Sequence, residues 1–156
     1  MEIRPLRDGD VPQLFELAQT IVKDGTTYVF EDANDFVSAF LRGHAFVAVE
    51  GDALLGAYFF RANQPGRGAH VANASYAVTE AARNQGVGRA LGEHSLTAAR
   101  ERGFRALQFN LVVATNETAI NLWKKLGFDV VGTLPLSFMH ESDGYVDALV
   151  MYRLLD

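Results

Sequence analysis

The most constraining stretch of the sequence covers residues 78–92, VTEAARNQGVGRALG. Before it, HVANASYAV alternates small, apolar and polar residues with a period near two, which predicts a strand with two different faces. After it, apolar residues recur at helical spacing over residues 87–98. Gly86 and Gly88 therefore fall in the first turn of a helix that directly follows a strand.

A turn of this kind is suited to bind a phosphate or diphosphate group. The first N–H groups of a helix have no partner within it, the helix dipole is positive there, and glycines let an anion approach closely. Arg83 and Arg89 add positive charge on either side. The residues expected to bind the anion are Arg83, Asn84, Gln85, Gly86, Val87, Gly88, Arg89 and Ala90.

Three kinds of phosphate-binding loop could contain these glycines. A Walker loop requires Lys-Ser or Lys-Thr after its last glycine, and neither pair occurs in the chain. A dinucleotide loop requires an acidic residue about 20 residues later to bind a ribose, where the strand FRALQFNLVV offers only Asn110. The third pattern, R-x-x-G-x-G, is present at residues 83–88.

This pattern and a second block, NETAINLWKKLGF at residues 116–128, resemble the two signature segments of the GNAT superfamily of N-acetyltransferases. With their flanking strands they cover about residues 69–133. The resemblance implies acetyl-CoA as co-substrate and no metal. It also implies that the Val78 N–H points at the thioester oxygen and that Asn116 and Trp123 lie beside the CoA arm. Asn116 is equally suited to cap the helix that begins with this second block.

Trp123 departs from the commonest pattern of that family, in which a tyrosine at this position protonates the leaving sulfur. An indole N–H donates a hydrogen bond but is not a usable acid. We therefore expect Trp123 to form a wall beside the thioester, and solvent, Tyr76 or Tyr145 to supply the proton.

Asn73 and Asn110 lie on the two strands that are expected to separate after the glycine turn. Asparagine is depleted in strands, so this pair requires an explanation. VANASYAV, QFNLVVATN and GYVDALVMYR resemble the GNAT subgroup of fungal acetyltransferases that act on azetidine-2-carboxylate and other proline analogues. This implies that Asn73 and Asn110 bind the acceptor. An equally open interpretation is that both amides only hydrogen-bond to the sheet.

The remaining pattern predicts an α/β fold: one GNAT-like domain over residues 1–156, with a mixed, mostly antiparallel sheet of six to seven strands and about four helices. Asp10 and Gln13 predict a capping box at the first helix. Asp32 predicts the cap of a second helix, whose apolar face would be Phe36, Val37, Phe40 and Leu41. Residues 135–144 are expected to form an exposed loop.

The acceptor pocket is expected to involve the segment between the first two helices and the loop at residues 135–144. The residues expected to bind the acceptor are Tyr28, Phe30, Glu31, Asn73, Asn110 and His140, and the catalytic candidates are Asn73, Asn110 and Tyr76. The candidates for a general base are Glu31, His70, His140, Asp143 and Tyr76.

Composition narrows the possible functions. The absence of cysteine excludes disulfides and an acyl-cysteine intermediate, and a net charge of −5 argues against nucleic acid as the main partner. The chain has no apolar run near the ~20 residues of a membrane span and no signal-peptide pattern, so we expect a cytoplasmic enzyme. The resulting prediction is an N-acetyltransferase for a small amine. The family resemblance, and no particular residue, suggests a homodimer. A non-catalytic acyl-CoA-binding module and a protein N-terminal or lysine acetyltransferase are the alternatives.

Overall fold

The computed structural model describes residues 1–156 and contains one seven-stranded sheet in the order β1-β2-β3-β4-β5-β7-β6. The strands are β1 (Glu2–Pro5), β2 (His44–Glu50), β3 (Ala53–Ala62), β4 (Val71–Val78), β5 (Ala106–Val113), β6 (Asp129–His140) and β7 (Gly144–Leu154). The helices are α1 (Val11–Asp24), α2 (Ala33–Leu41), α3 (Val87–Glu101) and α4 (Glu117–Lys125), with short 3-10 turns at Asp8–Asp10, Gly66–Gly68 and Glu80–Ala82. Only the β4–β5 pair is parallel, which confirms the predicted mixed, mostly antiparallel sheet.

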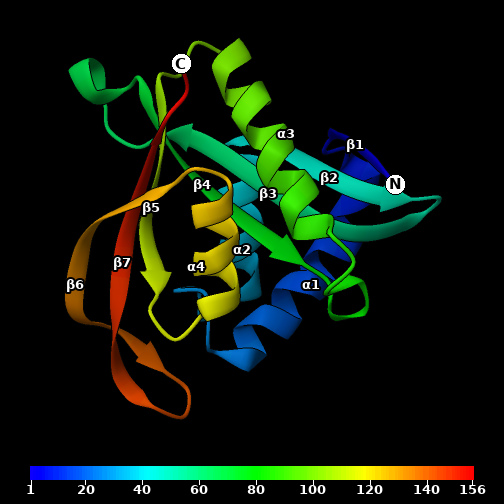
Figure 1. Ribbon diagram of the computed structural model, residues 1–156. Coiled ribbons are helices and arrows are strands. Elements are labelled where there is room, and N and C mark those ends of the chain that lie inside the picture. The colour runs from blue at the N-terminus through cyan, green and yellow to red at the C-terminus, as the bar shows by residue number, and fades with distance from the viewer.

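The helices cover both faces of the sheet, as Figure 1 shows: α3 and α4 lie in front of it and α1 and α2 behind it. Alternating residues of β3 supply the two cores. Tyr58 and Phe60 pack with α3 and α4, whereas Ala57 and Phe59 pack with α1 and α2. No helix combines the length and the hydrophobicity needed to cross a bilayer.

Asp32 caps α2 as predicted, because its carboxylate accepts a hydrogen bond from the Asn34 N–H at 2.7 Å. Phe36, Val37 and Phe40 of this helix are buried, but Leu41 is 57% exposed and does not belong to its apolar face.

The capping box predicted for α1 is wrong. A 3-10 turn precedes the helix, so Asp10 is already in helical conformation and its side chain makes no cap. Its carboxylate instead pairs with Arg4 at 2.8 Å and accepts the Arg7 N–H. The Gln13 side chain bonds the Asp52 carbonyl and the Leu54 N–H, and so ties α1 to the β2–β3 hairpin.

The exposed loop predicted at residues 135–144 is also wrong. β6 continues to His140, and only the short turn before β7 is outside the strands. The register shifts between Leu134 and Phe138, where Leu136 has a φ of 50° and donates its N–H to Asp147. Pro135 and this irregular segment interrupt the strand pattern that sequence reasoning relies on.

Candidate active site

The centre of the candidate site is a gap between β4 and β5. The two strands pair only from Val71 and Ala106 to Asn73 and Gln108, and β5 continues against β7. Figure 1 shows the two strands diverging, with α4 in front of the opening. The separation predicted from the sequence is therefore present.

Main-chain groups of β4 face this gap. In a strand, the N–H and C=O groups of one residue point to the same side, and those of the next residue point to the opposite side. Thr79 donates its N–H to Leu55 of β3, and Val71 accepts on the same side from Asn63. Tyr76 and Val78 therefore direct their N–H groups away from β3, to the side that β5 has left.

The glycine turn before α3 presents a row of unpaired N–H groups. Gly86, with a φ of 80°, is the N-cap, and Asn84 also has a positive φ of 61°. The N–H groups of residues 85–89 have no acceptor within the chain, whereas the Ala90 N–H bonds the Gly86 carbonyl at 3.0 Å. This end of α3 can accept an anion as predicted from the sequence, with Ala90 contributing no free N–H.

The two arginines of this turn differ in their surroundings. Arg83 is exposed and has no carboxylate within 4 Å, while Arg89 Nε pairs with Glu93 at 2.8 Å. The Gln85 side chain donates to the Ala81 carbonyl, which holds the turn closed on itself. Arg83 is therefore the unpaired cation of this turn, and Arg89 is in an exposed pair.

Asn116 and Trp123 place α4 against the gap. The Asn116 side chain caps α4 by accepting the Ala119 N–H at 3.3 Å. Trp123 is buried, and its ring lies 4.6 Å from that of Tyr76 and 4.8 Å from that of Phe109. Its position agrees with a wall of the site.

A cavity of about 410 Å³ opens at the gap, and 13 of its 19 lining residues are hydrophobic. It brings together these predicted site residues: Tyr28, Phe30, Asn73, Tyr76, Asn110, Asn116 and Trp123. Val78 and residues 83–90 lie outside the lining, toward the α3 turn. Glu31 and His140 do not line it either.

Asn73 and Asn110 already have hydrogen-bond partners in the sheet. Asn73 Nδ2 donates to the Gln108 carbonyl at 3.1 Å, at the last paired position before the strands separate. Asn110 Nδ2 donates to Asn63 at 2.7 Å, and its Oδ1 accepts from Gln108. The Asn73 Oδ1 has no such bond, so this amide combines a structural contact with a free acceptor.

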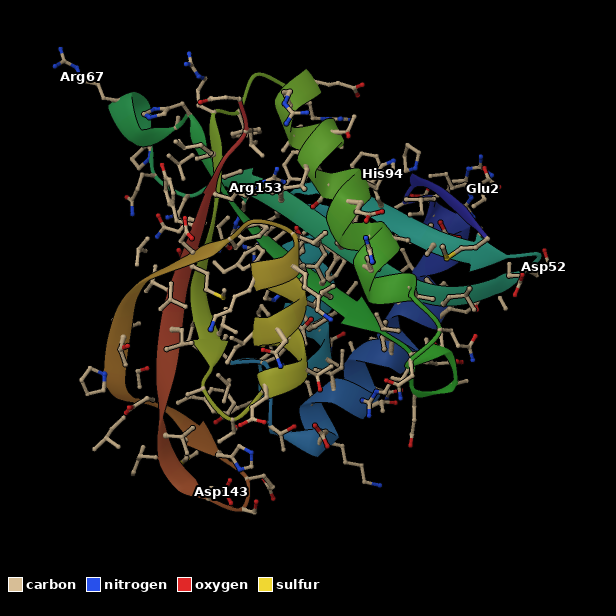
Figure 2. The ribbon with its side chains drawn as sticks, in the orientation of Figure 1. Glu2, Asp52, Arg67, His94, Asp143 and Arg153 are labelled. Atoms are coloured by element: carbon tan, nitrogen blue, oxygen red, sulfur yellow. The ribbon has the colours of Figure 1, made fainter.

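None of the histidine or carboxylate candidates for a general base lines the cavity. His140 Nδ1 accepts the N–H groups of Ser142 and Asp143 in the β6–β7 turn. Figure 2 shows Asp143 at the tip of that hairpin. His70 borders a separate hollow together with Arg105. Tyr76 lines the cavity, but burial raises the pKa of its hydroxyl, which is hydrogen-bonded to Ser95.

Sequence reasoning missed Arg61, which is the one charged residue of the cavity lining. Arg61 lies near the end of β3, directly opposite Asn73 on β4. Ser75 and Thr27 were also missed. The position of Arg61 beside Asn73 depends on the strand register, which the sequence does not show. The one sign of Arg61 in the sequence is a cation in a strand that is otherwise apolar.

Comparison with known proteins gives a consistent result. Residues 12–128 match the model of the acetyltransferase (GNAT) family. A GCN5-related N-acetyltransferase from Kribbella flavida is 41% identical, with a TM-score of 0.92 over 98% of this chain and 96% of that one. N-acetyltransferase aca1 from Schizosaccharomyces pombe is 38% identical over 99 residues, which are 63% of this chain and 47% of that protein. The chain thus matches about half the length of this yeast relative.

A protein from Salmonella typhimurium, whose structure contains its cofactor acetyl-CoA, shares the fold at 21% identity. The TM-score is 0.87, over 100% of this chain and 94% of that one. The glycine turn, the separated strands and the family match agree with each other. The chain belongs to the GNAT family of acetyltransferases.

Proposed function

We propose that the protein transfers the acetyl group of acetyl-CoA to the amine of a small acceptor that also carries a carboxylate. The observation that supports this most directly is the cavity at the gap between β4 and β5, in which Arg61 is the single charged residue. The amine would attack the thioester directly while both substrates are bound.

The donor would bind along the gap, with its diphosphate at the N–H groups of residues 85–89 and near Arg83. The main-chain groups of Tyr76 and Val78 would hydrogen-bond to the CoA arm like an added strand. Tyr76 lines the cavity and Val78 does not. The Tyr76 N–H is directed at the Tyr28 hydroxyl oxygen, so the Val78 N–H would be the main-chain donor to the thioester oxygen, as expected from the sequence.

The acceptor would occupy the cavity with its carboxylate toward Arg61. Arg61 is an exposed lining residue, and its guanidinium disfavours a purely cationic amine and favours an acceptor with an anionic group. Asn73 and Asn110 line the same cavity and offer further polar contacts. The resemblance of VANASYAV, QFNLVVATN and GYVDALVMYR to acetyltransferases that act on proline analogues supports an amino acid or a proline analogue as the acceptor.

No side-chain carboxylate or imidazole in the cavity is available to remove a proton from the amine. The acceptor would therefore react after its ammonium group has lost a proton to water. Turnover would rise with pH toward the pKa of the acceptor amine itself.

Release of free CoA with matched acceptors tests this proposal. Prolinamide lacks the carboxylate of proline, and azetidine-2-carboxylate keeps the carboxylate on a smaller ring. We expect the two acids to be better substrates than prolinamide. Arg61→Gln should raise the KM of the acids by about 10-fold to 100-fold, the value of a charged hydrogen bond, with little change for prolinamide. Equal use of the acid and the amide would contradict the carboxylate assignment. Acetyl-CoA binding without turnover on any amine would indicate a non-catalytic acyl-CoA-binding module.

We also propose that two copies associate through β6. This strand forms the edge of the sheet, and Val131, Leu136 and Met139 on it are 60%, 64% and 60% exposed. An unpaired apolar edge strand favours pairing with another chain. A molar mass of one chain in light scattering, at concentrations up to those used for activity, would contradict this.

A further inference from the structure

The phenolic hydroxyl of Tyr28 is the strongest further candidate for a role in the reaction. Of the five tyrosines of the chain, only Tyr28 and Tyr76 line the cavity. Tyr58 bonds His94 on α3, and Tyr152 borders the separate hollow near the end of the chain. A phenolic hydroxyl that acts on a ligand in the cavity must therefore come from Tyr28 or Tyr76.

The hydroxyl proton of Tyr76 is already committed. Ser95 Oγ donates its own proton to the Gly92 carbonyl at 2.7 Å. Tyr76 and Ser95 are 2.6 Å apart, so the Tyr76 hydroxyl must be the donor to Ser95. The Tyr28 oxygen faces the Tyr76 main-chain N–H, which donates to it, and the Tyr28 proton has no acceptor in the chain. Its proton is available to a ligand.

The Tyr28 ring is fixed where its hydroxyl meets β4. The ring packs edge-on against Phe36 of α2, with centroids 5.5 Å apart. Burial raises the pKa of the hydroxyl far above its ordinary value, the nearby Tyr76 hydroxyl adds to the rise, and the Tyr76 main chain opposes it. The phenol therefore stays protonated at physiological pH, close to the main-chain N–H that faces the gap.

We infer that the Tyr28 O–H, with its oxygen held by the Tyr76 N–H, binds the thioester oxygen as it becomes an oxyanion. This inference rests on the proposed function. It places the donor on the segment between α1 and α2, on the acceptor side of the sheet. Trp123 lies on the opposite, α4 side, so Tyr28 is not a replacement for a tyrosine at that position.

The step balances without another reactant. The amine nitrogen forms a bond to the carbonyl carbon, and the C=O π electrons move to the oxygen, which the Tyr28 O–H stabilises. The C=O bond then re-forms and the C–S bond breaks, with its electron pair leaving on sulfur. The nitrogen loses its proton to water and the thiolate takes one from water, which gives an amide and free CoA. Tyr28 keeps its proton throughout.

Tyr28→Phe tests the inference, because it removes the hydroxyl and keeps the ring on Phe36. We expect kcat to fall about 100-fold, the effect of losing one oxyanion donor, with the Kd of acetyl-CoA changed less than threefold. Tyr152→Phe is the matched control and should leave both values unchanged. A kcat within twofold of the parent would overturn the inference.

Infrared spectra of bound acetyl-CoA, labelled with ¹³C at the carbonyl, supply a reading that does not depend on turnover. In the parent protein the carbonyl stretch should lie below its value in free solution, and Tyr28→Phe should move it back part of the way. An identical stretch in both proteins would overturn the inference. A carbonyl stretch that shifts on Tyr28→Phe, in a protein without turnover on any amine, would contradict the proposed function and leave the role of Tyr28 supported. Turnover that is insensitive to Tyr28→Phe would do the reverse.

Discussion

The two ends of the gap between β4 and β5 are built from different parts of the chain. The donor end consists of main-chain N–H groups of one continuous segment, residues 76–89. The acceptor end consists of side chains from the α1–α2 segment, β3, β4, β5 and α4. A main-chain site is determined by glycine spacing and helix position, whereas a side-chain site is determined by which strands become neighbours. The first can bind the same donor in many proteins while the second differs between them.

The largest effect that this comparison predicts is at Gly86. Gly86→Glu places a carboxylate in the row of free N–H groups at a residue with a φ of 80°, so acetyl-CoA binding should weaken at least 100-fold. Gly103→Glu is the matched control, because Gly103 follows the opposite end of α3 and has a φ of 84°. Calorimetric titration of both variants measures the difference. Equal weakening in the two variants would mean that backbone strain, and not the anion site, is responsible.

Gly92 lies at the contact between α3 of the donor end and α4 of the acceptor end. A Cβ at this position would lie 2.5 Å from Leu126 Cδ1 and 3.1 Å from the Trp123 ring. Gly92→Ala should therefore lower the free energy of unfolding by about 1–3 kcal/mol, measured by urea denaturation. Gly132→Ala, where nothing lies within 4 Å, is the control. Leu126→Ala in the Gly92→Ala background should recover part of the loss if crowding is the cause.

Asn110 tests the acceptor end alone. Asn110→Ala removes a lining amide and its bonds to Asn63 and Gln108, so the KM of the acceptor should rise about 10-fold or kcat should fall, with the KM of acetyl-CoA almost unchanged. Asn121→Ala, an exposed residue of α4, is the control in steady-state assays. An equal loss for both substrates would show that Asn110 is structural.

The smallest effect concerns the scaffold behind both ends. Hydrogen bonding to Arg4 holds the pKa of Asp10 below its ordinary value of 3.8, although burial opposes this. The folded state therefore binds fewer protons than the unfolded chain, and this contribution to stability is present above about pH 4 and is lost as the pH falls toward the folded pKa. Asp10→Asn should make the acid side of the stability profile shallower, as followed by thermal unfolding between pH 3 and 7. A parallel profile in the variant would show that the pair contributes nothing.

Much of the fold was predictable because single residues mark its elements. The Asp32 and Asn116 caps and the glycine turn are local features, and each element lies where they predict. The Asp10 cap failed because Arg4, six residues away, offers the carboxylate a better partner. The extent of β6 was missed because Leu136 breaks its pattern.

The candidate site divides in the same way. The glycine spacing predicts its donor residues, and in the structure the N–H groups of residues 85–89 have no acceptor whereas the Ala90 N–H is already used. Arg61 could not be predicted, because its place beside Asn73 depends on the β3–β4 register. The expectation that Glu31 and His140 bind the acceptor stays a prediction, since neither lines the cavity of this structure.

The most direct test of the central claim compares acetyl-CoA with S-acetylpantetheine, which has the same thioester arm and no diphosphate. If the free N–H groups of residues 85–89 bind the diphosphate, calorimetry should show acetyl-CoA binding at least 100-fold more tightly than S-acetylpantetheine. Gly86→Glu should reduce that ratio to near one. Equal affinity of the parent protein for the two compounds would contradict the account.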